Sequence, residues 1–107
     1  AEAQIDLINV EDKIACARAT ADAGAQVMGI HTGLDAQAAG HTPFADLYDI
    51  AALGLPVRIS VAGGIKASTV QDVVRAGANI IVVGAAIYGA ASPAEAAREI
   101  RELVDAV

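Results

Sequence analysis

The sequence is poor in aromatic side chains, in cysteine and in basic residues. Among its 107 residues there are two Tyr, one Phe and no Trp, so the core must be built from Ala, Val, Ile and Leu. The single cysteine, Cys16, excludes an internal disulfide framework and fits a reducing compartment. Seven basic and 13 acidic side chains give a net charge of −6, without a basic cluster. Nucleic-acid binding needs a Lys/Arg footprint, so this composition argues against it.

Signals for membranes and secretion are also missing. No apolar run approaches the roughly 18–20 residues that span a bilayer. No basic segment followed by an apolar one marks a secretory signal. We therefore expect a cytoplasmic protein without membrane partners. Apolar residues make up 55% of the chain, too many for a disordered protein, and the length predicts a single domain over residues 1–107.

A pattern of β-rich run, turn and helical stretch occurs four times along the chain. The predicted strands are residues 4–8, 27–31, 57–62 and 79–84. Val and Ile dominate the last two, which predicts strands buried on both faces. The predicted helices are residues 11–23, 43–53, 68–76 and 92–104. Strand–helix alternation with short connections predicts a parallel sheet built from βα units.

Three sequence signals predict where helices begin. Asn9 is a candidate cap for the first helix. Ser68 followed by Gln71 resembles a capping box. Ser92 is followed by proline and then, at the third helical position, by Glu95, which is a stronger start signal. In a weak internal repeat, Gly24 and Gly77 each stand between two alanines and are predicted to end a helix before the next strand.

The size of the chain limits how these units assemble. Four units in 107 residues are about 27 residues each, whereas a complete (β/α)₈ barrel takes about 200–250 residues. The chain is thus expected to form half of a TIM barrel. A flavodoxin-like doubly wound domain that lacks one strand is the alternative. Four parallel strands alone leave two edges and one face uncovered, which predicts closure by dimerisation or by a partner half.

Two glycine turns follow the third and fourth predicted strands. Gly63 and Gly64 end the third strand, and Gly84 and Ala85 end the fourth. Glycine lets a backbone approach a ligand closely, and unpaired N–H groups can hold an anion. One such turn is often only steric. Two turns on adjacent strand ends favour a phosphate site of the kind that barrels build after strands seven and eight.

His31 and Asp6 are the candidate catalytic residues. His31 ends the second strand, where a histidine can transfer protons near neutral pH; a structural histidine is the alternative. Asp6 lies between apolar residues of the first strand, which indicates either placement in a site or a buried salt bridge. His41 is expected in solvent, and Arg58 is expected to pair with a carboxylate. No Cys/His cluster or paired-histidine spacing predicts a metal site in this chain.

The motifs together resemble a known enzyme family. They are the Asp6 segment, the run HTGLDAQAAG over residues 31–40, the AGGI turn over 62–65, the VGAA turn over 83–86 and the SPAEAA run over 92–97. This set resembles the 3-hexulose-6-phosphate synthases of the orotidine 5′-phosphate decarboxylase superfamily, which also includes 3-keto-L-gulonate-6-phosphate decarboxylase. The resemblance covers nearly the whole chain. It matches only the second half of the family's barrel, units five to eight.

The resemblance implies a lyase of the aldolase type from the ribulose monophosphate pathway of carbohydrate metabolism. The synthase fixes formaldehyde onto D-ribulose 5-phosphate through an enediolate that Mg²⁺ stabilises. By resemblance, His31 is the proton-transfer residue and Asp6 orients the substrate or a neighbouring side chain. The phosphate would be held by the backbone N–H groups of Gly63, Gly64, Gly84 and Ala85.

The chain departs from the family in one respect, and one residue helps to choose between its two enzymes. The family's Asp-x-Lys-x-x-Asp motif is absent, so the Mg²⁺ ligands are expected in the half of the barrel that this sequence does not match. The decarboxylase tends to have an arginine where this chain has Leu34, which favours the synthase. A decarboxylase-like lyase and a non-catalytic, self-associating half-barrel that binds sugar phosphates are the alternatives.

Overall fold

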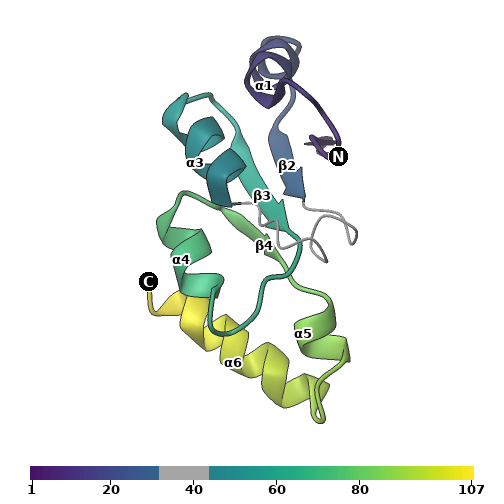
Figure 1. The fold of residues 1–107 in the computed structure, drawn as a ribbon, viewed down its shortest axis with the longest axis vertical. Helices are drawn as coiled ribbons and strands as arrows, with labels where there is room; N and C mark the ends of the chain where they lie inside the picture. The colour runs from purple at the N-terminus through teal and green to yellow at the C-terminus, as the bar shows by residue number, and fades with distance from the viewer. Residues whose placement is uncertain (32–43) are drawn as a thin grey trace.

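The computed structural model describes residues 1–31 and 44–107, which form a parallel sheet with helices between its strands (Figure 1). The strands follow the order β1-β2-β3-β4 and are β1 (Gln4–Asp6), β2 (Val27–His31), β3 (Arg58–Ala62) and β4 (Ile80–Val82). The helices are α1 (Lys13–Asp22), α3 (Phe44–Ala52), α4 (Val70–Arg75), α5 (Ala85–Tyr88) and α6 (Pro93–Asp105). The four predicted βα units and their parallel pairing are confirmed.

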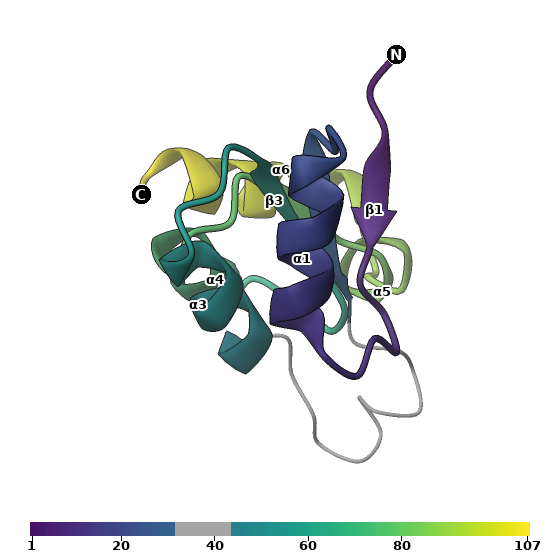
Figure 2. The same cartoon turned by 90° about the horizontal axis from the view of Figure 1, so that it is seen from above.

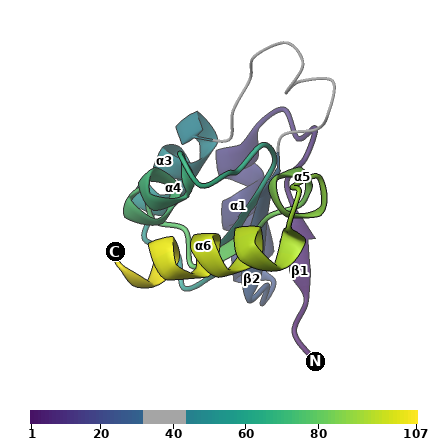
Figure 3. The same cartoon turned by 90° about the horizontal axis from the view of Figure 1, so that it is seen from below.

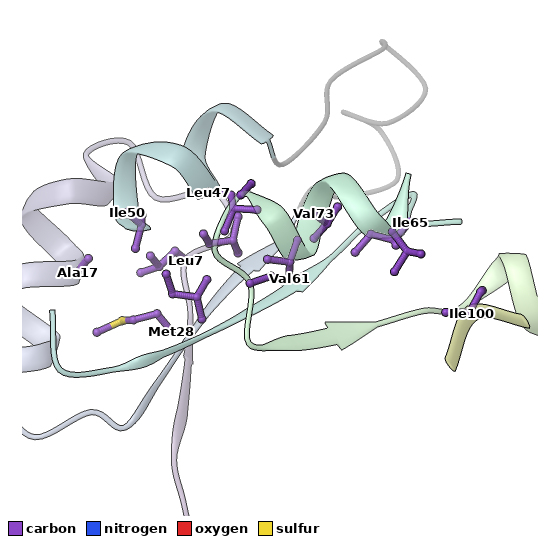
Figure 4. Packing of buried hydrophobic residues seen from close by; sticks show 14 residues of the cluster. Leu7, Ala17, Met28, Leu47, Ile50, Val61, Ile65, Val73 and Ile100 are labelled. Carbon is purple, nitrogen blue, oxygen red and sulfur yellow. The ribbon is translucent and has the colours of Figure 1, made fainter. Parts of the chain in front are cut away.

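One face of the sheet is covered by the helices. Side chains alternate along a strand, so every second residue contacts the helices. Met28 pairs with Ile59, and Ile30 pairs with Val61. All four are buried in one cluster with residues of α1, α3, α4 and α6 (Figure 4). We call this the helix-covered face; β1 and β4 contribute the partly buried Ile5 and Ile81 to it.

The other face, which we call the open face, carries the intervening residues. Aligned there are Asp6, Gly29, Ser60 and Ile80, and one level further along the strands His31, Ala62 and Val82. None of these seven belongs to the core cluster of the described residues. Val82 is 47% exposed. The prediction that the Val/Ile-rich strands are buried on both faces is therefore wrong for β4, because helices cover only one side of it.

The helix starts correct two predictions and confirm one. α1 is capped by Asp12, whose Oδ1 accepts from the Ala15 N–H at 3.0 Å, and not by Asn9. Asn9 instead has a φ of +60°, in the left-handed region that Asn tolerates. Ser92 caps α6 as predicted, since its Oγ accepts from the Glu95 N–H at 3.3 Å.

The capping box predicted for α4 is not formed. The helix begins at Val70, after Thr69, and the Thr69 hydroxyl contacts Lys66 rather than the helix N–H groups. The Gln71 side chain donates instead to the carbonyl oxygen of Leu103 at 3.1 Å. This bond ties α4 to α6, which packs against both α4 and α5 (Figure 3).

Glycines end two helices as the repeat predicts. Gly24 follows α1 with a φ of +101°, and Gly77 follows α4 with a φ of +118°. Both angles are costly for any residue that carries a Cβ atom. Short turns after them return the chain to the sheet. A short helix that the sequence does not predict, α5, follows β4 directly.

The two edges of the sheet are β1 and β4. The N-terminal segment leads into β1 in an extended path (Figure 2). Near this edge Arg58 forms an ion pair with Glu2, which confirms its predicted carboxylate partner. At the other edge, the Asn79 side chain accepts from the Ile59 N–H at 2.8 Å before β4 begins. In the described residues, no helix is long and apolar enough to cross a membrane.

Candidate functional site

The carboxyl ends of three strands meet at one edge of the sheet. His31, Ala62 and Val82 are aligned across β2, β3 and β4. The chain leaves β3 at Gly63 and Gly64, and it leaves β4 two residues before Gly84. The parallel register therefore brings the histidine and the two glycine turns to the same end of the open face.

An open cavity of about 600 Å³ lies at this edge. Its lining includes five of the six predicted site residues: His31, Gly63, Gly64, Gly84 and Ala85. Ala62, Ile65, Lys66, Val82, Ala86 and Tyr88 complete the lining. Sequence reasoning thus placed residues from three separate units in one site, because strands in a parallel sheet all end on the same side.

The turn after β3 depends on its paired glycines. Gly63 has a φ of +110° and Gly64 a φ of +67°. A side chain with a Cβ atom rarely adopts either angle. Ile65, the next residue, is 5% exposed and packs in the core cluster. The buried isoleucine anchors the turn, and the glycines leave their backbone accessible from the cavity.

Lys66 and Tyr88 line the cavity, and sequence reasoning missed both. Lys66 directly follows the glycine turn, and its backbone is held by Thr69: the Lys66 N–H donates to the Thr69 hydroxyl at 3.2 Å. Tyr88 ends α5 and is 76% exposed. A lysine immediately after a predicted anion-binding turn was a signal available in the sequence. Tyr88 lies on a helix that the sequence did not predict, so nothing pointed to it.

Asp6 contacts His31 at the margin of the cavity. The Asp6 Oδ2 atom lies 3.6 Å from Nδ1 of His31, and the two side chains are 45% and 40% exposed. Oδ1 of Asp6 accepts from the Ile8 N–H at 2.9 Å, which fixes the carboxylate. The structure thus excludes a buried salt bridge for Asp6. At 3.6 Å the contact with His31 is an ion pair when the imidazole is protonated, and it is too long for a hydrogen bond.

Part of the resemblance lies outside the described residues. Leu34, His41 and the run after His31 belong to residues 32–43, so the predictions that rest on them have no structural counterpart here. Three residues outside the cavity can be placed. Cys16 is half-buried against the core. Arg75 and Arg98 form exposed pairs with carboxylates on their own helices.

A magnesium site does not fit the described residues. Mg²⁺ takes six oxygen ligands and is bound through one or two carboxylates together with water and substrate oxygens. Within residues 1–31 and 44–107, no three His, Cys, Asp or Glu side chains gather in one place. Asp6 stands at the cavity margin, where Ile8 and His31 already engage its two oxygens.

Comparison with known proteins identifies the family. The family model described as "Orotidine 5'-phosphate decarboxylase / HUMPS family" matches residues 1–100. The chain belongs to this family. The resemblance to 3-hexulose-6-phosphate synthases is confirmed by the synthase of Methylomonas aminofaciens, which is 61% identical over 102 residues. The synthase of Mycobacterium gastri is 45% identical over the same number of residues.

The relatives are about twice as long as this chain. The matched region covers 95% of the chain but 49% of the M. aminofaciens synthase, and 94% of the chain but 48% of the M. gastri synthase. The crystal structure of the synthase from Salmonella typhimurium superposes with a TM-score of 0.93 at 40% identity, covering 98% of this chain and 50% of that one. The four βα units of this chain therefore correspond to half of a TIM barrel.

Proposed function

We propose that the chain is one half, units five to eight, of a 3-hexulose-6-phosphate synthase-like aldolase that adds formaldehyde to D-ribulose 5-phosphate. The observation that carries this proposal is the single cavity in which His31 meets both glycine turns. The synthases that match the chain at 61% and 45% identity support the substrate assignment. We assign the whole range 1–107 to one half-barrel domain.

The sugar phosphate is held at its phosphate end by the glycine turns. Gly63 and Gly64 line the cavity beyond the end of β3, and Gly84 and Ala85 line it beyond the end of β4. We assign their backbone N–H groups to the phosphate. The positive φ angles of the glycine pair let the backbone approach the anion without an intervening side chain. Binding energy at the phosphate, remote from the reacting carbon, positions the sugar for reaction.

His31 performs the proton transfers at the reacting carbon. Ribulose 5-phosphate carries its ketone at C2, and a 3-hexulose results when one carbon is added to C1. The imidazole of His31 takes a proton from C1, and the electron pair of that C–H bond forms the enediolate. C1 then attacks formaldehyde, a C–C bond forms, and the oxygen that was the aldehyde carbonyl receives a proton from the imidazolium.

Asp6 acts on this reaction through His31. Its Oδ2 atom lies 3.6 Å from Nδ1 of His31, where the carboxylate orients the imidazole for the proton transfers. The Ile8 N–H bond holds the carboxylate in place. The resemblance also implies Mg²⁺, which would stabilise the enediolate oxygens. We place its ligands in the half of the barrel that this chain does not match.

A completing half covers the open face and the two sheet edges. β1 and β4 each have a single neighbour in the described sheet, and Val82 is 47% exposed. A groove of about 510 Å³ runs between β4 and α6, lined by Ile81, Val83, Ile100 and neighbouring residues. An exposed parallel edge beside apolar side chains is unfavourable in water. A second copy of the chain or an N-terminal half-barrel supplies the missing strands.

A non-catalytic half-barrel that associates with itself and binds sugar phosphates is the second candidate function. The described residues contain no group of three possible metal ligands, which favours this function. Closure by a second copy would duplicate the phosphate site without adding the family's Asp-x-Lys-x-x-Asp motif. A lyase of the 3-keto-L-gulonate-6-phosphate decarboxylase type is the other catalytic alternative. It shares the enediolate and reaches it by loss of CO₂.

Formaldehyde consumption distinguishes these functions. The 107-residue chain is incubated with D-ribulose 5-phosphate and Mg²⁺, first alone and then with the unmatched half of the M. aminofaciens synthase. Samples without the sugar phosphate correct for the reaction of formaldehyde with protein amines. We expect turnover in the completed barrel. Release of CO₂ from 3-keto-L-gulonate 6-phosphate in place of formaldehyde uptake would instead identify the decarboxylase.

The mass of the chain in solution completes this test. A dimer that binds sugar phosphate but shows no turnover, alone or with the added half, supports the non-catalytic function. A folded sample that neither turns over nor binds a sugar phosphate contradicts both candidates.

A further inference from the structure

The cavity at the strand ends has a lysine in its wall, and its described lining carries no carboxylate. Lys66 lines it beside Gly63 and Gly64. The remaining lining consists of His31, Tyr88 and residues with apolar or no side chains. The whole chain carries a net charge of −6, so an anion is repelled by most of the molecule. Lys66 is thus a local positive charge where the proposed function needs a dianion to bind.

The backbone at Lys66 is held independently of its side chain. The Lys66 carbonyl oxygen accepts from the N–H groups of Thr69 and Val70, at 3.0 and 2.9 Å. Its N–H donates to the Thr69 hydroxyl at 3.2 Å. On the other side, Ile65 is buried in the core. The contacts with Thr69 and Val70 and the burial of Ile65 therefore fix the Lys66 backbone, and none of them involves the Lys66 ammonium group.

The ammonium group of the other lysine, Lys13, is engaged within the fold. The Lys13 ammonium donates to the Val10 carbonyl at 3.0 Å and lies 3.6 Å from the Asp46 carboxylate. Within the described residues, Lys66 has no ion pair of this kind. A lysine whose ammonium is engaged contributes to the fold, whereas one that lines a cavity at a fixed backbone position is available to a ligand.

We infer that Lys66 is the charged phosphate contact of this site and selects phosphorylated sugars over neutral ones. The inference rests on the proposed function and deepens it. Backbone N–H groups also favour charged oxygens but carry only partial charges, whereas an ammonium group adds a full positive charge opposite an anionic partner. The glycine turns shape the phosphate subsite and Lys66 supplies its charge.

The test compares Lys66→Met with Lys13→Met, which removes the same charge elsewhere. Binding of D-ribulose 5-phosphate and of inorganic phosphate is measured by calorimetry on the chain or the completed barrel, whichever binds. The Gly63 and Gly64 amide resonances report the location. We expect Lys66→Met to weaken ribulose 5-phosphate binding by about 10-fold or more, because a hydrogen bond to a charged group is lost. Lys66→Arg is expected to retain most of the affinity, and Lys13→Met all of it.

Ionic strength provides a second measurement. The affinity of the unmodified protein is expected to fall as salt is added, and that of Lys66→Met to fall less. Equal affinities for Lys66→Met and Lys13→Met, with the glycine amides still shifting, would overturn the role of Lys66 and leave the proposed function intact. If neither ligand shifts these amides in the unmodified protein, the phosphate site fails and the inference fails with it. The backbone hydrogen bonds of Lys66 do not involve its side chain, so Lys66→Met and Lys66→Arg are expected to fold. Urea unfolding of Lys13→Met checks that the control also folds, since its ammonium contacts Val10 and Asp46.

Discussion

The two faces of the sheet differ in how complete they are. On the helix-covered face, Met28, Ile30 and Val61 are each no more than 1% exposed. On the open face, the neighbouring residues His31 and Val82 are accessible, and Asp6 is 45% exposed at its side chain. β2 supplies residues to both sets. Within the described residues, the helices thus bury one face of the sheet and leave His31, Val82 and Asp6 accessible on the other.

Ser60 belongs to the open face but is buried. It lies at the centre of β3 on the open face and is 1% exposed, yet its hydroxyl has no hydrogen-bond partner among the described residues. Its neighbours in the register are Gly29 and Ile80, neither of which offers a polar side chain. Buried polar groups are nearly always paired in native proteins. The unpaired hydroxyl of Ser60 is therefore an unfavourable feature of the sheet as this chain forms it.

The largest effect is expected from His31→Ala, which acts on the open face alone. In the completed barrel we expect formaldehyde turnover to fall by about 10²–10⁴-fold, the usual contribution of a positioned acid–base group. Phosphate affinity is expected to remain near that of the unmodified protein, since the glycine turns belong to other strands. Turnover is measured together with calorimetric binding. An equal loss of binding and turnover would contradict the proton-transfer role.

Ile30→Ala and Val82→Ala compare the two faces directly through stability. Ile30 is 1% exposed within the core cluster, and its truncation is expected to cost about 2–5 kcal/mol. Val82, 47% exposed, is expected to cost far less in the chain alone. Urea unfolding gives both values. In the completed barrel the cost of Val82→Ala is expected to rise, because the added strands bury it. An unchanged cost there would show that the open face stays open.

The sequence predicted the sheet well because its signals are local. The predicted strands 27–31 and 57–62 match β2 and β3 almost to the residue. The glycine turns predicted the site for the same reason: a parallel βα unit leaves no choice about which end of the strand a turn occupies. His31 and Gly63 could therefore be assigned to one cavity without coordinates.

The wrong predictions concern two helix caps and the burial of β4. The caps depend on competition between similar neighbouring residues, and the burial of β4 depends on atoms outside the chain. Asn9 and Asp12 are both good caps; Asn9 adopts the left-handed region, and Asp12 accepts from the Ala15 N–H at the start of α1. Ser68 and Thr69 both carry a hydroxyl near the start of α4. Thr69 takes the cap position, but its hydroxyl accepts from the Lys66 N–H instead of from a helix N–H. The exposure of β4 could not be predicted. A run of Val and Ile does not show whether the residues that pack on its second face belong to the same chain.

Gly64→Val separates phosphate binding from stability at the edge of the open face. A β-branched residue at a φ of +67° is strained by about 1–3 kcal/mol and places carbon atoms where the anion approaches. Gly24→Val, at a φ of +101° with nothing within 4 Å of the added Cβ atom, is the control for strain. We expect both variants to lower stability and only Gly64→Val to weaken ribulose 5-phosphate binding. Unchanged affinity in Gly64→Val would place the phosphate elsewhere.

Ser60→Ala tests whether the open face tolerates the loss of a polar group. Removing a buried hydroxyl without a partner relieves a desolvation penalty, so the chain alone is expected to gain up to about 1 kcal/mol in urea unfolding. In the completed barrel this gain is expected to disappear if a group of the other half bonds to the hydroxyl. A clear loss of stability in the chain alone would mean that Ser60 is already paired.

The smallest effect is expected on the outer surface of α6, beyond the helix-covered face. Arg101 and Asp105 form an exposed pair there, and the hydrogen bond from Arg101 lowers the pKa of the Asp105 carboxyl. A lowered pKa contributes stability only above the unfolded-state value, about pH 4, and that contribution is lost as the pH falls through the folded-state pKa. Water screens a fully exposed pair, so Asp105→Asn is expected to leave the urea midpoint at pH 7 unchanged within error. A resolvable drop at pH 7 that vanishes near pH 3 would show that this helix surface is less solvated than its exposure indicates. In that event, the outer surface of α6 would resemble the open face, as a second surface that the chain alone leaves incompletely covered.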